Sequence, residues 1–368
     1  MNKLQENKAR ILTFLAYYFA IPHNANMTNK IPQWLLYCRP GFEKECAQET
    51  NALVLEAQSD SGFILVQGKP HLQFDQLIFA RQLISWHGEI SDLPQRDRLT
   101  PLLQVLSNLV DAPKKFGALW LETPDTNDGK TLSSFTQRFQ PLLEAPLITN
   151  GMLVSDPALP RLHIFFTNQN RALIGSSIPQ NSAPWHMGIL RQKMPHDAPS
   201  RSYLKLAEAF AVLLNADEQK KWIVSGMSAV DLGAAPGGWT WQLVQRGLKV
   251  TAIDNGPLKG VAEKHPAIKH LRQDGFRYRP SKPVDWLVCD MIEQPARVAA
   301  LIADWVASGL TQHAIFNLKL PMKKRLDALT QALHGIQSML GAKGIRYRLR
   351  AKHLYHDREE VTVFLTVK

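Results

Sequence analysis

Four charged residues of this 368-residue chain stand where an α/β protein places its chemistry. Asp290 directly follows an apolar run, Lys319 follows the next such run, Glu360 opens the last one, and Lys205 lies on a helical stretch that precedes them all. Ligands of open α/β sheets bind at the carboxyl ends of the strands, so two lysines and two carboxylates could converge there. Taken singly, each has a more ordinary explanation as a surface lysine, a strand cap or a solvated charge. Their joint placement favours a catalytic site.

Such a group could remove a proton from a weak nucleophile such as a hydroxyl. A lysine has a pKa of about 10.4 in water and acts as a base only where burial or a second cation lowers that value. We expect Lys319 to be the base, with Lys205 favouring its neutral form. Asp290 and Glu360 would orient the ammonium groups and balance their charge. The same carboxylates would raise the lysine pKa, so geometry decides which influence dominates.

A glycine-rich stretch, residues 228–254, is the element that must position these groups. Residues 229–232 predict a strand, residues 233–238 a tight turn, the residues after it a helix, and residues 250–253 a second strand that ends at Asp254. Glycines let the backbone turn sharply and let a ligand approach it closely. Asp254 lies about 20 residues after the turn, the offset at which a carboxylate accepts hydrogen bonds from a ribose. The stretch is therefore predicted to be a nucleotide-binding βαβ unit.

The features that this turn lacks indicate its cofactor. A dinucleotide site has the pattern G-x-G-x-x-G, whereas Gly233 is followed by Ala234, Ala235 and Pro236. A phosphate-binding P-loop would require G-K-S or G-K-T, which the turn does not contain. S-adenosylmethionine has an adenosine and an amino acid but no phosphate, and it is the candidate that remains. The predicted reaction is methyl transfer to a hydroxyl, and the ordinary alternative is a turn that only packs a helix on a strand.

Basic charge is concentrated in the half of the chain that holds this turn. The formal net charge is +11; residues 1–200 contain 18 basic and 17 acidic side chains, and residues 201–368 contain 25 and 15. A basic domain attracts polyanions, so nucleic acid is the natural partner. Cys38, Cys46 and Cys289 form no C-x-x-C motif, which argues against a disulfide framework or a zinc site. We expect no metal and a reducing compartment.

The chain divides into four predicted segments. Residues 1–30 are an extension that is poorly ordered or results from a mis-assigned start; their apolar run is too short to span a membrane. Residues 31–177 form an α+β region, residues 178–200 a linker, and residues 201–368 a Rossmann-like domain. In this last segment strands alternate with helices, which predicts a doubly wound, mostly parallel sheet. The first segments contain no cluster of titratable groups that looks catalytic.

The patterns also predict individual elements. Strands are expected at 34–38, 53–56, 63–66, 118–122, 162–166, 171–175, 268–271, 284–289, 314–318, 345–349 and 361–367. Helices are expected at 41–49, 99–110, 132–143, 203–214, 295–307 and 322–340, with Ser202 as a cap for the fourth. The connection between the last two strands is short, so they should be antiparallel neighbours.

Several stretches resemble a known family. The turn D-L-G-A-A-P-G-G-W, residues 231–239, resembles the cofactor motif of the FtsJ-type ribose 2′-O-methyltransferases, which use S-adenosylmethionine. Lys205, Asp290, Lys319 and Glu360 match the Lys-Asp-Lys-Glu tetrad of that family in chain order. The stretches C-R-P-G-F-E-K-E, residues 38–45, and A-P-S-R-S-Y-L-K-L-A-E-A-F, residues 198–210, are similar to bacterial members that act on large ribosomal RNA. The resemblance begins at about Ile31.

The resemblance implies a cytoplasmic monomer with a THUMP-type or ferredoxin-like RNA-binding region before a Rossmann-like domain with a seven-stranded sheet. It implies methylation of the ribose 2′-hydroxyl of a cytidine in the peptidyl-transferase region of 23S rRNA, before the subunit is complete. Lys319 is then the proton acceptor, and Glu360 is preferred to Glu359 because it adjoins the strand. The residues implied to contact S-adenosylmethionine are Ser202, Ala235, Pro236, Gly237, Gly238, Asp254, Asp274 and Asp290.

Two other functions compete with this interpretation. One is an RNA base methyltransferase, although enzymes that modify exocyclic amines usually have N-P-P-Y or D-P-P-Y where C-D-M-I, residues 289–292, stands here. A carbon-5 enzyme would need a catalytic cysteine, and Cys289 is more readily explained as a core residue. The other function is a non-catalytic RNA-binding assembly factor. A nicotinamide oxidoreductase is disfavoured by the glycine spacing.

Overall fold

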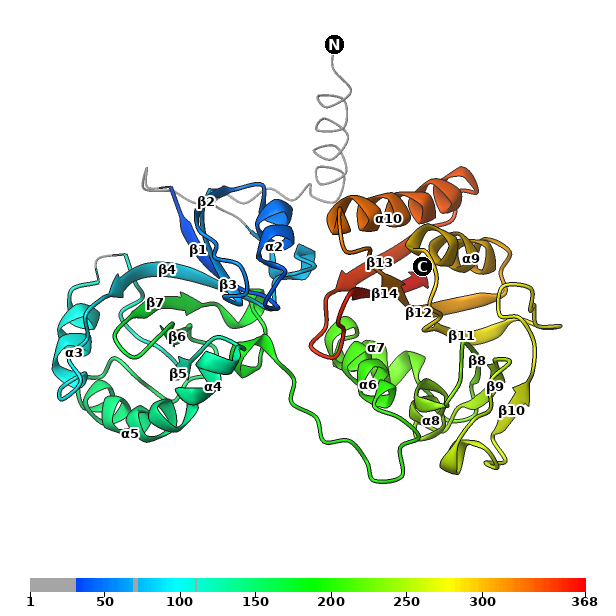
Figure 1. Cartoon of the computed structure of the whole chain (residues 1–368), viewed down its shortest axis with the longest axis horizontal. Helices are drawn as coiled ribbons and strands as arrows, with labels where there is room; N and C mark the ends of the chain where they lie inside the picture. The colour runs from blue at the N-terminus through cyan, green and yellow to red at the C-terminus, as the bar shows by residue number, and fades with distance from the viewer. Residues whose placement is uncertain (1–30, 69–71, 110) are drawn as a thin grey trace, which may run out of the picture. The chain divides into compact units, whose positions relative to one another are not determined.

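The computed structural model describes residues 31–68, 72–109 and 111–368, and the prediction for residues 1–30 lies outside them. Two seven-stranded sheets contain the named strands of these residues (Figure 1). The first sheet is built by residues 33–177 and the second by residues 228–367.

The first sheet has the strand order β2-β3-β1-β4-β7-β6-β5. Its pairings are antiparallel except for the parallel pair β5 and β6. The strands are β1 (Gln33–Tyr37), β2 (Leu53–Glu56), β3 (Phe63–Gln67), β4 (Gln82–Ile90), β5 (Ala118–Glu122), β6 (Arg161–Phe166) and β7 (Ala172–Ser177). The helices between them are α2 (Glu43–Thr50), α3 (Leu99–Ser107), α4 (Asn127–Thr131) and α5 (Ser133–Thr149).

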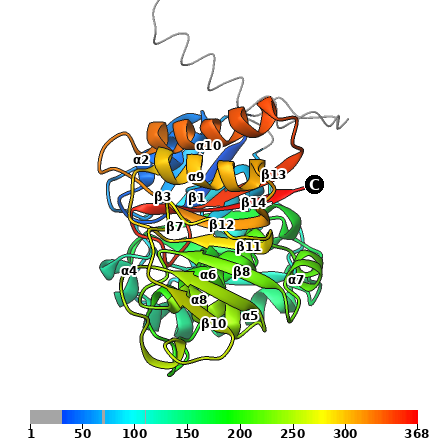
Figure 2. The ribbon, with the colours of Figure 1, turned by 90° about the vertical axis from the view of Figure 1, so that its right-hand side faces the viewer.

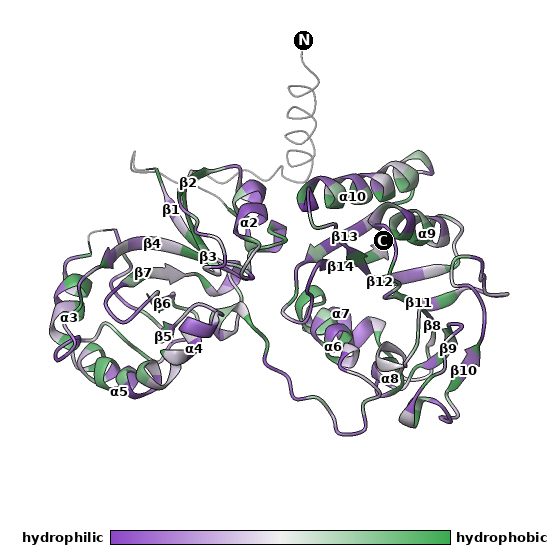
Figure 3. Cartoon of the chain, in the orientation of Figure 1, coloured by the Kyte–Doolittle hydropathy of each residue, from purple (hydrophilic) through white to green (hydrophobic). Residues whose placement is uncertain are grey.

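Helix α5 is longer than predicted because its apolar stripe continues past two prolines. Phe139, Leu143 and Leu147 recur every four residues and are buried in the core of the first sheet. A proline inside a helix destabilises it by about 3 kcal/mol, and burying each large apolar side chain stabilises the fold by about 2 kcal/mol. Burial of the three side chains therefore offsets the two prolines. Both hydropathy colours run along α5 in Figure 3, as expected for a helix with one buried face.

Strand β4 was not predicted. Its sequence, Q-L-I-S-W-H-G-E-I, does not alternate between apolar and polar residues. The register against β7 shifts between Trp86 and Gly88, so a bulge interrupts the side-chain alternation of this strand. The strand nonetheless lies between β1 and β7 in the sheet.

The beginning of the predicted linker packs against the first sheet. Two 3-10 turns, Pro179–Asn181 and His186–Gly188, follow β7. Ala183 and Ile189 are buried, and the backbone N–H of Met187 donates to Glu122 at 2.6 Å.

The second sheet has the order β10-β9-β8-β11-β12-β14-β13. Its first five strands are parallel, and β14 is antiparallel to both β12 and β13. The strands are β8 (Ser228–Leu232), β9 (Lys249–Ile253), β10 (Ile268–Leu271), β11 (Val284–Cys289), β12 (Thr311–Lys319), β13 (Tyr347–Lys352) and β14 (Glu360–Val367). This confirms the predicted Rossmann-like, mostly parallel seven-stranded sheet and its antiparallel last pair.

Helices cover the second sheet. They are α6 (Ser202–Leu213), α7 (Ala216–Trp222), α8 (Gly238–Val244), α9 (Pro295–Ala307) and α10 (Arg325–Ala342). Phe210 of α6 and Trp239 of α8 join Trp286 and Phe364 of the sheet in one core. Helix α9 packs on β12, and α10 packs on α9; Figure 2 shows these two helices side by side. The short helix α7 was not predicted.

Candidate active site

The antiparallel pairing of β14 with β12 brings the predicted catalytic residues together. Lys319 at the end of β12 lies directly opposite Glu360 at the start of β14. Asp290 follows β11, whose last residue, Cys289, pairs with Phe316 of β12. Lys205 is one turn into α6. Four residues that are up to 155 positions apart therefore meet at one edge of the sheet.

Each lysine of this tetrad contacts both carboxylates. Lys319 Nζ donates to Asp290 Oδ1 at 2.8 Å and also to Glu360 Oε2. Lys205 Nζ lies 3.5 Å from Asp290 Oδ2 and donates to Glu360 Oε1. The side chains of the two lysines are 18% and 22% exposed, so the tetrad is partly shielded but reachable from solvent. Two positive and two negative charges balance.

The carboxylates decide the charge state of Lys319. Burial lowers the pKa of this lysine, but the charges and hydrogen bonds of Asp290 and Glu360 outweigh burial and raise the pKa above its ordinary value. The predicted influence of Lys205 toward the neutral form is thus not the dominant one. Lys319 is an ammonium at neutral pH when no substrate is bound.

The neighbouring glutamates have different partners. Glu360 is 4% exposed and bonds both lysines. Glu359 pairs with Arg325 at 2.8 Å. Glu360 is the first residue of β14 and faces the tetrad, whereas Glu359 precedes the strand and its carboxylate is engaged by Arg325.

The glycine-rich turn has the conformation that its sequence predicts. Gly233 and Gly237 have φ values of 79° and 112°, which residues with a Cβ rarely adopt. Asp254, at the end of β9, accepts hydrogen bonds from the backbone N–H of Ala235 at 3.0 Å and of Gly256 at 2.7 Å. Asp254 is only partly buried, so its oxygens keep acceptor capacity for a ligand. These contacts tie the turn after β8 to the end of β9.

Ser202 lies at the turn but does not cap α6, so the capping prediction was wrong. It is the first residue of the helix, and Arg201 occupies the cap position without a side-chain hydrogen bond. Its Oγ instead lies 2.7 Å from Ser200 Oγ. A Cβ on Gly238 would lie 2.1 Å from Ser202 Oγ, which shows how closely α6 approaches the start of α8. A glycine is required there.

Asp274 follows β10 and is not part of the tetrad. Its side chain is 50% exposed, and its Oδ1 accepts from the N–H of Phe276 at 2.9 Å. A Cβ on the next residue, Gly275, would lie 2.9 Å from Met291 Sδ, and one on Gly233 would lie 2.7 Å from Met291 Cγ. Met291 therefore bridges the Asp274 loop and the glycine turn.

These residues fit S-adenosylmethionine. Asp254 offers acceptors for ribose hydroxyls, and Asp290 stands beyond the turn with a partly exposed carboxylate. Asp231, on β8 just before the glycine turn, is fully buried, and its Oδ1 has no hydrogen-bond partner among the described residues. Burial, with Asp290 and Asp254 adding to it, raises the pKa of Asp231 to about 7. The carboxylates that suit the cationic sulfonium and ammonium groups of this ligand are therefore those of Asp254 and Asp290, since the raised pKa of Asp231 favours its neutral form.

The polar residues behind the tetrad were not predicted. Asn317 is fully buried and donates to Asp290 Oδ1 at 2.8 Å. Thr362 bonds Asn317, and Asp357 bonds Thr362. Asn317 and Thr362 lie two positions from Lys319 and Glu360 on their strands, so strand alternation offered a signal for these two. Nothing in the sequence indicated Asp357, which lies in a loop.

Cys289 is a core residue. It is 0% exposed, and burial raises the pKa of its thiol to about 12. A thiol of this kind is a poor nucleophile at neutral pH. The structure therefore favours a packing role for Cys289 over a role as a catalytic nucleophile.

The first sheet contains a cluster of titratable groups that was not expected there. His163 lies 2.8 Å from Glu122 and 2.7 Å from Ser177, in the order of a hydrolytic triad. Tyr37 also donates to Glu122 at 2.8 Å. All four side chains are 3% exposed or less, so no substrate can reach them. The cluster is a hydrogen-bonded network in the interior of the sheet.

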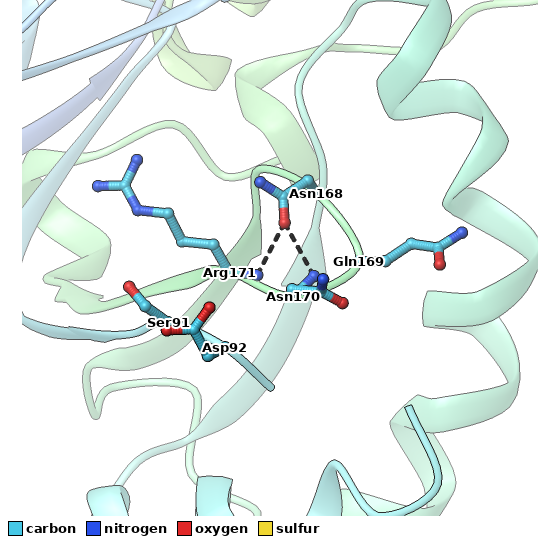
Figure 4. A pocket seen from close by; sticks show the side chains of 6 residues that line it. All are labelled: Ser91, Asp92, Asn168, Gln169, Asn170 and Arg171. Atoms are coloured by element: carbon cyan, nitrogen blue, oxygen red, sulfur yellow. Dashed lines mark hydrogen bonds between the residues drawn. The ribbon is translucent and has the colours of Figure 1, made fainter. Parts of the chain in front are cut away.

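A hollow near the end of β4 is equally separate from the predicted site residues. It is lined by Ser91, Asp92 and residues 168–171 (Figure 4). Asn168 Oδ1 accepts from the backbone N–H of Asn170 and Arg171 at 2.8 and 2.9 Å. The Arg171 guanidinium pairs with Glu56 and Glu89. Asn168 and Arg171 are therefore already engaged within the protein.

In the part of the chain that the structure describes, no group of three or more His, Cys, Asp or Glu side chains is arranged to hold a metal ion. No helix among these residues is long and apolar enough to cross a membrane.

Three family models match successive parts of the chain. The model described as RlmM ferredoxin-like domain matches residues 31–84. The model for the N-terminal region of ribosomal RNA large subunit methyltransferase M matches residues 97–178. The model of FtsJ-like methyltransferases matches residues 198–335, which include the glycine turn and the first three tetrad residues.

Whole proteins are also similar. A ribosomal RNA large subunit methyltransferase M from Laribacter hongkongensis is 53% identical over 343 residues, which cover 90% of this chain and 96% of that protein. The protein of the same description from Methylococcus capsulatus is 49% identical over 348 residues, with coverages of 90% and 97%. Among solved structures, Aeropyrum pernix fibrillarin with bound S-adenosylmethionine has a TM-score of 0.35 at 15% identity, covering 55% of this chain and 81% of that one. A likeness of this size carries no functional weight.

Proposed function

Because the chain belongs to the ribosomal RNA large subunit methyltransferase M family, we propose that it methylates the ribose 2′-hydroxyl of a cytidine in the peptidyl-transferase region of 23S rRNA. Family membership makes it a methyltransferase that acts on large-subunit rRNA. The observation that supports ribose chemistry is the tetrad of Lys205, Asp290, Lys319 and Glu360. A neutral sugar hydroxyl needs a base, and the tetrad supplies one.

S-adenosylmethionine is the cofactor and supplies an electrophilic methyl group. Lys319 Nζ, in its neutral form, would accept the proton of the 2′-hydroxyl as that oxygen takes the methyl group. The bond between the methyl carbon and the cofactor sulfur would break, with its electron pair remaining on sulfur, so that S-adenosylhomocysteine would leave. The proton remains on Nζ, where Asp290 and Glu360 stabilise the ammonium that forms. Lys205 binds the same carboxylates and so weakens their hold on Lys319.

The cofactor is proposed to lie along the glycine turn. Asp254 accepts hydrogen bonds from its ribose, and residues 235–238 let the backbone approach the adenosine. Ser202, Asp274 and Asp290 complete the proposed contacts from α6 and the strand ends. The support for this placement is that Met291 joins the loop of Asp274 to the turn at Gly233.

We propose that residues 31–177 form the RNA-binding region, of THUMP type, and that residues 178–200, the first part of which packs on the first sheet, link it to the methyltransferase domain at 201–368. The basic excess of that last segment supports RNA as the substrate. We further propose that the protein acts as a cytoplasmic monomer on rRNA that is naked or in a precursor particle.

The test is methyl transfer from labelled S-adenosylmethionine to 23S rRNA taken from cells that lack this protein, with the product nucleoside identified by mass spectrometry. We expect a ribose-methylated cytidine. Label on a base would show a base methyltransferase and overturn the proposed role of the tetrad. RNA binding without any label would identify an assembly factor instead.

A further inference from the structure

Three buried polar side chains form a row behind the tetrad. Asp357, in the loop before β14, Thr362 on β14 and Asn317 on β12 are each 0% exposed. Placing polar groups in a protein interior is costly unless they are fully hydrogen-bonded. A row of three such groups beside a reactive lysine therefore calls for a function.

Strand register connects the row to the tetrad. Asn317 lies directly opposite Thr362, just as Lys319 lies opposite Glu360. Residues two positions apart on a strand share a face, so the two cross-strand pairs are neighbours. Thr362 Oγ1 lies 2.7 Å from Asn317 Oδ1, and Asn317 Nδ2 lies 2.8 Å from Asp290 Oδ1. That same oxygen of Asp290 accepts from Lys319 at 2.8 Å.

The direction of these hydrogen bonds follows from counting hydrogens. Asn317 must turn its amide N–H toward the Asp290 carboxylate, which leaves its carbonyl oxygen facing Thr362. A threonine hydroxyl has one hydrogen, and here it lies between two acceptors: Asn317 Oδ1, and the Asp357 carboxyl at 2.9 and 3.1 Å. Each contact can be a separate two-centre hydrogen bond only if Asp357 carries a proton and donates it to Thr362. Asp357 Oδ2 then accepts from the N–H of Leu354 at 3.0 Å.

The surroundings of Asp357 agree with a protonated acid. Burial raises its pKa well above the usual range, and the carboxylates of Glu360 and Glu208 act in the same direction. Lys205 and the Leu354 N–H act in the opposite direction and are the weaker influences.

We propose that protonated Asp357, Thr362 and Asn317 are positioning residues that hold Asp290 in the orientation in which its Oδ1 faces Lys319. This inference rests on the proposed function, since it assigns the row a role in the reaction of Lys319. The row fixes one carboxylate of the tetrad from its buried side, while the other, Glu360, is fixed by its own strand. The ammonium of Lys319 then keeps a single position at the edge of the sheet.

The test compares Thr362→Val with Thr362→Ser in steady-state and single-turnover methylation, with S-adenosylmethionine affinity measured alongside. Valine has the shape of threonine without its hydroxyl. We expect kcat to fall by about 10- to 100-fold, because small displacements of reacting groups cost this much, while KM for RNA and cofactor affinity stay within about twofold. Without the row, Asp290 is held less firmly and its ion pair with Lys319 weakens. The pKa of Lys319 should then fall, so the pH-rate profile should level off at a lower pH than in the wild type. Serine should restore both properties.

The matched control is Thr366→Val. Thr366 lies on the same strand, is 2% exposed and lies opposite His313, whose Nδ1 is 2.8 Å from its hydroxyl. This variant loses a comparable buried hydrogen bond away from the tetrad, so it should lose stability but keep kcat and the pH profile. If Thr362→Val behaves like Thr366→Val, the row is only structural and the proposal is wrong. The same follows if serine fails to rescue.

A second variant serves if Thr362→Val does not fold. Asp357→Asn has the shape of the protonated acid, with an amide N–H for Thr362 and an oxygen for the Leu354 N–H. Asp357→Leu, which has no hydrogen to donate to Thr362, should lower kcat by about 10- to 100-fold, and Asp357→Asn should stay within about twofold of the wild type. A leucine variant with the wild-type kcat would refute the proposal, and a loss of tenfold or more in the asparagine variant would show that Asp357 acts as a carboxylate. Failure of the proposed function is distinguished from failure of this inference by the product of the wild-type enzyme: a methylated base refutes the former whatever the variants do.

Discussion

At the residue scale, the two lysines of the tetrad differ in what holds them. Lys319 is on a strand and is bonded by Asp290 and Glu360 from two neighbouring strands. Lys205 is on a helix, donates to Glu360 and lies 3.5 Å from Asp290. A strand side chain opposite its carboxylate has little freedom, so Lys319 is the lysine with a fixed position. This supports its assignment as the base.

The raised pKa of Lys319 predicts a rate that rises with pH. Only the neutral amine accepts a proton, and below the pKa its fraction increases about tenfold for each pH unit. We therefore expect kcat/KM for RNA, which reports groups of the free enzyme, to rise steadily from about pH 6 to about pH 9. The measurement is a pH series with constant ionic strength. A profile that is level above pH 7 would show that another group accepts the proton.

Residue identities in the tetrad could be predicted because each stands next to a recognisable strand or motif. The positions of Asn317, Thr362 and Asp357 could not, since their importance depends on which strand β14 pairs with and in which register. The direction of the Lys319 pKa shift could not be predicted from the sequence either. Burial lowers this pKa and two carboxylates raise it, and the distances in the folded protein decide which effect is larger.

At the element scale, the antiparallel strand β14 builds the site. Its insertion between β12 and β13 brings Glu360 to the carboxyl end of a parallel strand. The strands and helices of residues 228–367 were largely predictable because their apolar runs are continuous and separated by clear turns. Strand β4 was missed because a bulge and polar residues hide its alternation.

Helix α7 was missed although it has a recognisable start. Asn215 accepts from the N–H of Glu218 at 2.8 Å, and Glu218 accepts from the N–H of Asn215 at 2.9 Å, which is a capping box. Glu218 also pairs with Arg348 and Arg350 of β13. At seven residues the helix is too short for a strong apolar pattern, so its stability depends on these contacts.

Replacing Asn215 by alanine should therefore weaken the fold without affecting chemistry. Loss of the cap should lower the free energy of unfolding by about 1 kcal/mol, as measured by chemical denaturation, and leave kcat unchanged. Asn215→Asp, which keeps an acceptor, is the control and should retain most of the stability. An alanine variant as stable as the wild type would mean that the ion pairs with β13 hold the helix without its cap.

At the scale of the whole molecule, charge is distributed unevenly between two sheets of equal strand number. Residues 201–368 have 25 basic against 15 acidic side chains, while residues 1–200 are nearly balanced. The tetrad is neutral in itself, so the excess lies elsewhere on the methyltransferase half. This basic charge is available for phosphates of the substrate.

RNA binding should accordingly depend strongly on salt. Each neutralised phosphate releases counterions, so we expect affinity for 23S rRNA fragments to fall by about 100-fold or more between about 50 and 200 mM salt. The affinity for S-adenosylmethionine, which has no phosphate, should change by less than about twofold. Equal salt dependence of both ligands would argue against an electrostatic RNA surface on this half.

The most direct test of the central claim, that Lys319 is the base for ribose methylation, is single-turnover methyl transfer by Lys319→Ala beside the wild type. We expect the wild type to label a ribose 2′-oxygen and the variant to react about 100- to 10,000-fold more slowly, with S-adenosylmethionine affinity and thermal stability retained. A variant that binds cofactor, stays folded and methylates the same ribose at the wild-type rate would contradict the account.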